Sequence, residues 1–570
     1  MRCAGVLCLL PLVALAAEPV PQDWYRVIRE NKLPALKAMA GSKSAVNAAD
    51  SRGVTPLMQA AAVGSIDAMK ILLAAGADVN ARSGLEITPL LYGATNPAKV
   101  RLLVEAGADV NAKSKFGRTA LIVAAGCPGG SESVRLLLSK GANPKVKDNA
   151  HITPLVEAAR VNDFESLRLL LDHPAEIDEG DRFGYTPLLY AASRANLAAT
   201  KLLLDKGADP NASHDSGLMV RNGPIALSNI TPLMMAPMSS LEVIQTLLDH
   251  GARVNARDGR GMTALMFAAA TERPNPAVVR LLLKAGADPE IESKDRERAR
   301  DWAAKFNQPE IMKLLNAHRP AEPESAITAV FDSSEELRQA LGRSVALLQA
   351  TSSEYFKQSG CVGCHHQPFI GMATDHAMRN SVAVDAAARR AQTQVVRTEN
   401  LSNRDLMLQG VFLSVDSLAS FVLHFSEAGQ PADEVTDALV SAIASQQKAD
   451  GSWYGAAVVR PPLEDSTWVR TAMAVKALAS YPIPARRVEF EARVARARKW
   501  LAESKPDVAY ERSFRLLGRV WSGAQGAEVA RVASDVRKLQ RTDGGWGQID
   551  QLRAMRSPPR SPCAPCSSLG

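Results

Sequence analysis

Apolar and polar positions in the first half of the chain repeat with a period close to 33 residues. Each unit opens with a Thr-Pro-Leu or Thr-Ala-Leu triplet, passes through an Ala-rich and then a Leu-rich stretch, and closes on a glycine-containing turn. Self-similarity at this period is typical of stacked helical units, so the pattern predicts one pair of helices per unit. The triplets begin at Thr55, Thr88, Thr119, Thr153, Thr186, Thr231 and Thr263.

Helix capping accounts for the residue types at the start and end of each unit. A threonine hydroxyl can accept a hydrogen bond from an unpaired N–H in the first helical turn, and proline suits the next position because no N–H is needed there. Gly76 and Gly107 stand where a helix must end in a left-handed residue. One unit cannot bury its own apolar face, so we expect the stability to come from stacking of neighbours.

These features resemble the ankyrin-repeat family, for example in Ile71-Leu72-Leu73 followed by Gly76-Ala77-Asp78. The resemblance implies a mainly α fold, a solenoid of helix pairs with short β-hairpin fingers over residues 23–318, with about seven full units and degenerate end repeats. It also implies a protein partner, bound through the finger tips and the concave helical face. No acid, base or nucleophile constellation is evident in this half, so we expect a binding scaffold rather than an enzyme.

Two local features of the array call for interpretation. The interval from Thr186 to Thr231 spans 45 residues and places an insertion around His214 to Asn229 at a hairpin finger. The insertion would lengthen one finger on the binding side, either as a partner contact or as a tolerated surface loop. Cys127, between Gly126 and Pro128, is interpreted as a small buried residue rather than a reactive thiol.

The first residues have the layout of a cleaved secretory signal. Basic Arg2 precedes an apolar stretch from Val6 to Ala16 that ends in small residues, and Glu18 follows at once. We therefore expect residues 1–17 to be a signal peptide and the protein to be secreted or periplasmic in a bacterium. No apolar run reaches the roughly twenty residues that a membrane span needs, so no membrane span is expected.

Charge and cysteine usage narrow the function further. The net charge is +7 and the pI about 9.0, but lysine and arginine are spread among nearly as many aspartates and glutamates, so no nucleic acid partner is expected. The seven cysteines do not form the spacing of a disulfide framework.

The 33-residue period stops at a linker, residues 319–332, that is rich in proline and charge. The next segment, 333–399, reads as helical and contains Cys361-Val362-Gly363-Cys364-His365-His366. Cys-x-x-Cys-His is the attachment signature of c-type haem. The sequence therefore predicts haem c bound covalently through Cys361 and Cys364, with His365 as the proximal iron ligand, for electron transfer or redox sensing with a redox partner.

Other interpretations of this motif stay open. The two cysteines could form a disulfide, which would leave a purely structural binding protein, or they could bind zinc together with His365 or His366, or bind nothing. The second axial ligand of a haem is also open. Its candidates are Met372, Met378, Met407, His376 and His424.

Two later segments, Gln447 to Trp453 and Gln540 to Trp546, both read Gln-x-x-x-Gly-x-Trp. They resemble the QW motif of squalene cyclases, whose fold is an α/α toroid, and the resemblance implies a partial toroid over residues 400–550. The Asp-x-Asp-Asp acid motif of the cyclases is absent, the nearest candidate being Glu464-Asp465, so a terpenoid cyclase is the third functional hypothesis. Each tryptophan is expected to pack its ring across a helix end.

The chain ends in an irregular tail, residues 551–570, that is rich in proline, serine and arginine. A truncation or a reading-frame shift near residue 550 would explain it, and a disordered tail is the alternative. Cys563 and Cys566 lack a following histidine, so a second haem site is not expected there.

Overall fold

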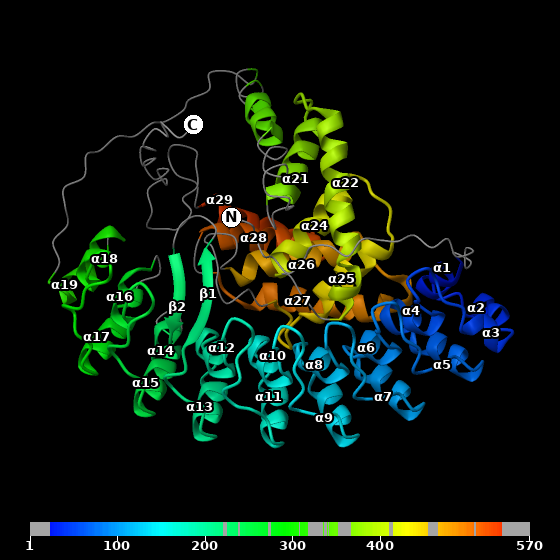
Figure 1. Ribbon diagram of the computed structural model, residues 1–570. Helices are drawn as coiled ribbons and strands as arrows, with labels where there is room; N and C mark the ends of the chain where they lie inside the picture. Colours follow the sequence, from blue (N-terminus) through cyan, green and yellow to red (C-terminus); the bar gives the residue numbers. More distant parts are fainter. Residues whose placement is uncertain are drawn as a thin grey trace, which may run out of the picture.

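The computed structural model describes residues 23–220, 225–236, 240–271, 275–306, 308–316, 335, 339, 341–350, 366–409, 414–453, 466–506 and 509–538. Within these residues the regular secondary structure is helical apart from one two-stranded sheet and one isolated bridge (Figure 1), so the prediction of a mainly α fold is confirmed. None of the helices in the described residues is long and apolar enough to cross a membrane.

The first half is a row of short antiparallel helix pairs that stack side by side in an arc (Figure 1). Its helices are α1 (Asp23–Arg29), α2 (Leu33–Met39), α3 (Lys43–Val46), α4 (Pro56–Val63), α5 (Ile66–Ala74), α6 (Pro89–Gly93), α7 (Pro97–Glu105), α8 (Ala120–Ala125), α9 (Ser131–Ser139), α10 (Pro154–Arg160), α11 (Phe164–Leu171), α12 (Pro187–Ser193), α13 (Leu197–Asp205), α14 (Pro232–Met235), α15 (Leu241–Asp249), α16 (Ala264–Ala269), α17 (Pro276–Lys284), α18 (Ala299–Lys305) and α19 (Pro309–Leu314).

The predicted helix-end chemistry is confirmed. The hydroxyl of the triplet threonine caps its helix in all seven units, as at Thr153, which accepts from the Val156 N–H at 3.1 Å. Gly76 and Gly107 have φ values of 88° and 91°, in the left-handed region.

In five of the turns an asparagine ties one unit to the next, a link that the sequence pattern did not predict. Asn80 donates to the Gly107 carbonyl at 3.1 Å and accepts from the Asp109 N–H at 2.8 Å. Asn111 repeats the pattern with Gly141 and Asn143. These hydrogen bonds satisfy backbone groups that the tight turns leave unpaired.

The insertion between α13 and α14 forms a β-hairpin. Strand β1 (His214–Val220) pairs antiparallel with β2 (Ile225–Ile230), with His214 opposite Ile230. The hairpin rises from the same edge of the array as the other fingers (Figure 1), so the predicted lengthening of one finger is confirmed.

The second half is a helical domain. Its helices are α21 (His366–Arg379), α22 (Ala386–Ser402), α23 (Arg404–Leu408), α24 (Val415–Glu427), α25 (Glu434–Ser445), α26 (Thr467–Ser480), the 3₁₀ turn η2 (Pro484–Arg486), α27 (Arg487–Glu503), α28 (Ala509–Trp521) and α29 (Ala527–Arg537). At its centre, α24 is buried from Val415 to Phe425 and packs against α21, α25 and α26.

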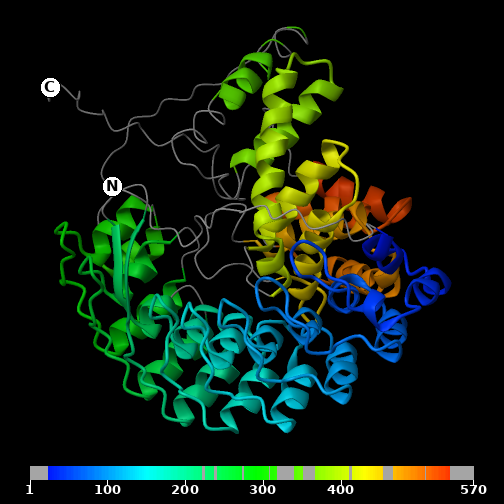
Figure 2. The same ribbon diagram turned by 45° about the vertical axis from the view of Figure 1, so that its right-hand side comes forward.

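The helical domain lies on the inner side of the arc (Figures 1 and 2). There it is next to the first helix of each early pair, namely α4, α6, α8 and α10. The end of the array formed by α16 to α19 extends away from it in both views. The second half of the chain therefore lies against the inner face of the array.

Several predictions concern residues outside the described ranges. These are the signal peptide, the linker 319–332, the motif from Cys361 to His365, the segment Gln540 to Trp546 and the tail 551–570. They stay predictions.

Candidate functional site

The first contact between the array and the helical domain joins α1 to α25. The Arg29 guanidinium donates from Nε to Oδ2 of Asp437 at 2.7 Å and from Nη2 to Oδ1 at 3.0 Å, a two-bond geometry that only arginine provides. The Tyr25 hydroxyl donates to the same carboxylate. Burial raises the pKa of Asp437, and the hydrogen bond from Arg29 opposes that rise. The ionised form of the Asp437 carboxylate is therefore stabilised by its hydrogen-bond partners in the array.

A second group of contacts surrounds Glu434. Nη2 of Arg52, on the first finger, lies 2.8 Å from Oε2 of Glu434, and Arg404 of the helical domain approaches the same oxygen at 3.3 Å. Beside them the Tyr92 hydroxyl, on α6, donates to Oδ1 of Asp405 at 3.1 Å. Burial raises the pKa of both acidic groups, and the charge of Arg52 works against that rise.

The third contact is centred on Arg118, whose side chain is 1% exposed. Its Nη1 lies 3.0 Å from Oδ2 of Asp148, and its Nη2 lies 3.0 Å from Oε1 of Glu157. Its third guanidinium nitrogen, Nε, donates to the Gln409 carbonyl of the helical domain at 2.9 Å. Burial alone would raise the pKa of Glu157, but the charges of Arg160 and Arg118 hold it below its usual value. One arginine therefore serves both halves of the chain.

A buried lysine lies under the same face. Lys99 is 4% exposed, and its Nζ donates to the carbonyls of Ala60 at 3.2 Å and Ala61 at 2.7 Å, near the end of α4. Burial, together with the positive charge of Arg486 in the helical domain, lowers its pKa to about 7. Lys99 is therefore balanced between its charged and neutral forms near neutral pH.

Comparison with known families identifies the array. A family model described as ankyrin repeats in three copies matches residues 82–148, 129–214, 217–293 and 233–327, and the model of a single ankyrin repeat matches residues 52–84. These residues are ankyrin repeats. Among solved structures, the ankyrin repeat domain of human ASB11 is 29% identical, with a TM-score of 0.34, and the match covers 41% of this chain and 100% of that one.

Ankyrin repeats make the first half of the chain a protein-interaction scaffold, and the segment that lies on its early repeats is the chain's own helical domain. The repeat pattern did not indicate which residues make these contacts: Tyr25, Arg29, Arg52, Tyr92 and Arg118. A weak signal was present, because Arg52 and Arg118 stand next to the glycines of finger turns, where ankyrin repeats present side chains to partners.

The first Gln-x-x-x-Gly-x-Trp segment ties the α25–α26 connection to α27. The Gln447 amide donates to the Arg493 carbonyl at 2.8 Å and accepts from Nη2 of Arg496 at 2.9 Å. Trp453 is fully buried, and its Nε1 donates to the Ile443 carbonyl in the last turn of α25 at 2.7 Å. The prediction that this tryptophan packs at a helix end is confirmed for Trp453.

The glycine of this segment is needed for two reasons. Gly451 has a φ of 95°, and a Cβ atom built there would lie 2.4 Å from the Arg496 carbonyl oxygen. The backbone of the segment therefore packs directly on α27, which is possible only without a side chain.

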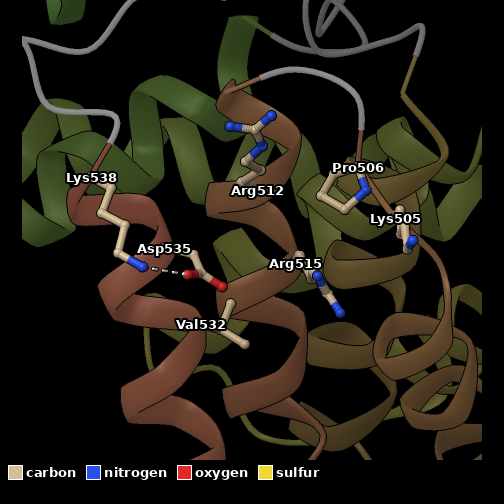
Figure 3. A pocket seen from close by; sticks show the side chains of 7 residues that line it. All are labelled: Lys505, Pro506, Arg512, Arg515, Val532, Asp535 and Lys538. Carbon is tan, nitrogen blue, oxygen red and sulfur yellow. Dashed lines mark hydrogen bonds and ion pairs between the residues drawn. The ribbon is translucent and has the colours of Figure 1, made fainter.

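A cavity of about 470 Å³ lies where the end of α27 meets α28 and α29 (Figure 3). It is lined by Lys505, Pro506, Arg512, Arg515, Val532, Asp535 and Lys538. Much of its charge is already engaged, because Arg515 donates to the Leu501 and Ala502 carbonyls and Lys538 lies 3.3 Å from Asp535. The lining residues include no histidine, cysteine or serine that could act as a nucleophile.

The predicted site residues fall into two groups. Cys361, Cys364 and His365 lie outside the described residues, so the haem attachment is untested. Cys127 lies inside them and is 3% exposed, and burial, aided by the charge of Glu157, raises the pKa of its thiol to about 12. Its interpretation as a small buried residue is confirmed.

The candidates for a second haem ligand differ sharply in their surroundings. Met378 is 44% exposed, Met372 is half-buried and Met407 is buried in the packing of α23. The side chain of His376 lies outside the described residues. His424 is fully buried and packs on Gly371 of α21, and within the described part of the chain neither of its ring nitrogens has a hydrogen-bond partner.

Proposed function

We propose that the protein is an exported interaction scaffold in which the early and the later ankyrin repeats bind different partners. The early ankyrin repeats hold the chain's own helical domain through Arg29, Arg52 and Arg118. The later repeats, from α12 to α19 together with the β1–β2 finger, present a surface to a protein partner. The observation that carries the proposal is the composition of the later fingers.

The fingers around α12 combine arginine with half-buried aromatic rings. Arg182 is exposed and lies 4.5 Å from the ring centroid of Phe183, and Tyr185 stacks on His214 of the long finger at 4.5 Å between centroids. Arginine and aromatic residues are enriched in protein interfaces because they bury much apolar area at a low cost in side-chain entropy. This region is the partner-binding surface of the proposal.

Site-specific photocrosslinking tests the proposed surface. A photoreactive residue at Phe183 should crosslink a discrete partner in the native host, and Arg182→Glu should reduce the yield. The matched control carries the photoreactive residue at Lys140, which is exposed at the end of the outer helix α9. Equal yields from the two positions, or a yield at Phe183 that Arg182→Glu leaves unchanged, would refute the assignment of this surface.

Export is supported by the basic, apolar and small-residue order of residues 1–17. Protein recovered from the periplasm of a bacterial host should begin at Glu18 when its N-terminus is sequenced. Recovery of the chain from the cytosol with Met1 to Ala17 intact would contradict export.

We propose as a second function that the chain carries haem c on Cys361 and Cys364, with His365 as proximal ligand, for electron transfer or redox sensing. The observation in its favour is the sequence motif Cys361-Val362-Gly363-Cys364-His365. When bound, the haem iron would supply a one-electron redox couple. The disulfide and zinc interpretations of the same motif are its competitors.

Covalent haem is tested on the exported chain expressed with c-type maturation. A c-type pyridine haemochrome band is expected, and it should be lost in the Cys361→Ser, Cys364→Ser double variant. Folded protein without the band would refute haem and leave a scaffold whose function is binding alone.

We further propose that residues 400–550 are a fragment of an α/α toroid. The proposal is supported by the way Gln447 and Trp453 tie successive helices together. Because the Asp-x-Asp-Asp acid is absent from the sequence, we expect no product from squalene or a prenyl diphosphate.

A further inference from the structure

We propose that the cavity between α27, α28 and α29 binds the phosphate group of a small organic ligand. The proposal rests on the charge of the cavity's lining, on the way its arginines are held, and on its size. It is independent of the partner-binding surface and of the haem, because it uses no residue that belongs to either.

The lining of the cavity has an excess of positive charge. Four of its seven residues are cations and one is an acid, which gives four positive charges and one negative charge, a net charge of +3. The one acid, Asp535, lies 3.3 Å from Lys538 and is already in an ion pair. The lining therefore keeps a positive charge that its own residues do not neutralise. Its cations are Lys505, Arg512, Arg515 and Lys538.

The hydrogen bonds of Arg515 hold its guanidinium in place without neutralising it. Nε donates to the Leu501 carbonyl at 3.0 Å and Nη2 donates to the Ala502 carbonyl at 2.9 Å, both in the last turn of α27. Carbonyl oxygens carry no net charge, so the full positive charge stays at the cavity. Burial, and then the charge of Arg531, lower the pKa of Arg515. An anion in the cavity would offset both effects.

A second arginine adds to this charge one helical turn away. Arg519 follows Arg515 by four residues on α28 and is 3% exposed. Its Nη2 donates to Glu528 of α29, whereas its Nε and Nη1 are buried without a hydrogen-bond partner in the described part of the chain. Burial, followed by the charges of Arg515, Arg531 and Arg498, lowers its pKa. Four arginines therefore lie close enough to raise one another's electrostatic cost.

A phosphate group matches this lining better than a single carboxylate does. At neutral pH a phosphate monoester carries about 1.5 to 2 negative charges and three acceptor oxygens. The planar fork of an arginine donates to two of these oxygens at once. The chemistry of the lining therefore favours a ligand with more than one negative charge on a single group.

The size and the remaining lining residues favour an organic phosphate. The volume of about 470 Å³ falls within the range of small-molecule sites, about 300–1,000 Å³. Pro506 and Val532 form an apolar part of the lining, on the segments beside α28 (Figure 3). The carbon skeleton of a phosphate ester can pack against these two side chains while its phosphate meets the cations.

Isothermal titration calorimetry of the full chain, in phosphate-free buffer of low ionic strength, tests the site. The probes are ribose 5-phosphate, inorganic phosphate and succinate. Wild type should bind one equivalent of ribose 5-phosphate. It should bind this ester more tightly than inorganic phosphate because of the apolar contact, and more tightly than succinate because of the charge on one group.

Charge variants locate the binding. Arg512→Gln should weaken binding of ribose 5-phosphate about tenfold or more, as expected for the loss of a charge-assisted hydrogen bond. Asp535→Asn should tighten it by up to about fivefold, because it removes the carboxylate of the lining. The matched control is Arg537→Gln, which removes an exposed charge of α29 outside the lining and should leave the affinity unchanged.

Opposite responses of the two lining variants cannot arise from misfolding, which would weaken binding in both. Lys505→Gln, at an exposed position, repeats the test of Arg512→Gln if that variant fails to fold. Circular dichroism at far-ultraviolet wavelengths shows whether each variant is folded.

Four results would overturn the proposal in whole or in part. Wild type that binds neither phosphate probe at millimolar concentration excludes the site. Equal losses in Arg512→Gln and Arg537→Gln would mean that the overall charge of the chain, not the cavity, attracts the anion. Equal affinities for ribose 5-phosphate and inorganic phosphate would exclude the organic part of the ligand. Tighter binding of succinate than of ribose 5-phosphate would exclude phosphate as the preferred group.

Discussion

Arg118 and Glu157 form an ion pair in which each side chain is only 1% exposed, with 3.0 Å between Nη2 and Oε1. The same arginine donates to the Gln409 carbonyl of the helical domain, so it lies at the joint between the two halves of the chain. Buried charges of this kind are costly to leave alone, which makes the joint sensitive to single substitutions.

Arg118→Met should destabilise the protein by about 3 kcal/mol, because Asp148 and Glu157 would remain buried with one fewer partner. Urea unfolding followed by circular dichroism measures the change. The control is Arg101→Met, which breaks an exposed pair with Glu132 and should cost less than about 1 kcal/mol. Similar losses from both substitutions would show that the burial of Arg118 is not important for stability.

The Arg29–Asp437 pair should show direct coupling between the two halves. In a double-mutant cycle built from Arg29→Ala and Asp437→Ala, we expect a coupling energy of about 1.5–3 kcal/mol, as for hydrogen bonds to charged groups. Arg29→Lys should recover only part of it, because lysine cannot make both bonds to one carboxylate. A coupling energy near zero would mean that α1 and α25 do not depend on this contact.

Lys99 should give the protein a stability that rises with pH. Its folded pKa of about 7 lies below the usual value of lysine, so between about pH 7 and pH 10 the unfolded chain binds more protons than the folded one. The free energy of unfolding of wild type, relative to Lys99→Met, should therefore increase across this range by at most about 1.4 kcal/mol per pH unit and stay constant below about pH 6. Lys201→Met, at an exposed position, should show no such pH-dependent difference.

Gly451→Ala should destabilise the helical domain by about 1–3 kcal/mol or more, because it combines an unfavourable φ with a clash against the Arg496 carbonyl. Gly429 is the matched control, since its φ is 66° and nothing lies within 4 Å of the position of an added Cβ. Gly429→Ala should cost only about 1 kcal/mol, the strain of φ alone. Thermal unfolding of both variants measures the difference, and equal losses would exclude close packing on α27 as the reason for glycine.

Local patterns in the sequence were sufficient for the array. The capping threonines, the left-handed glycines and the long finger near His214 each depend on neighbours a few residues away. The asparagine links, such as that of Asn80, were missed because they join adjacent units rather than positions within one.

The contacts between the array and the helical domain could not be predicted from local patterns. Arg29 and Asp437 are 408 residues apart, and each looks like an ordinary exposed charge on a helix. His424 lies on an apolar helix, and the sequence pattern of such a helix does not distinguish a buried histidine from a half-exposed one. Its burial results from the packing of α24 on Gly371 of α21. The haem attachment, the export signal and the toroid remain predictions.

The contacts with the helical domain determine which end of the array unfolds first. The units near α1 to α10 are held by their neighbours and by the second half of the chain, whereas those from α14 to α19 are held mainly by stacking and by asparagine links. Local unfolding should therefore begin at the α19 end and progress toward α10. Amide hydrogen exchange would show it as protection that decreases steadily along the array, with the fastest exchange in α18 and α19.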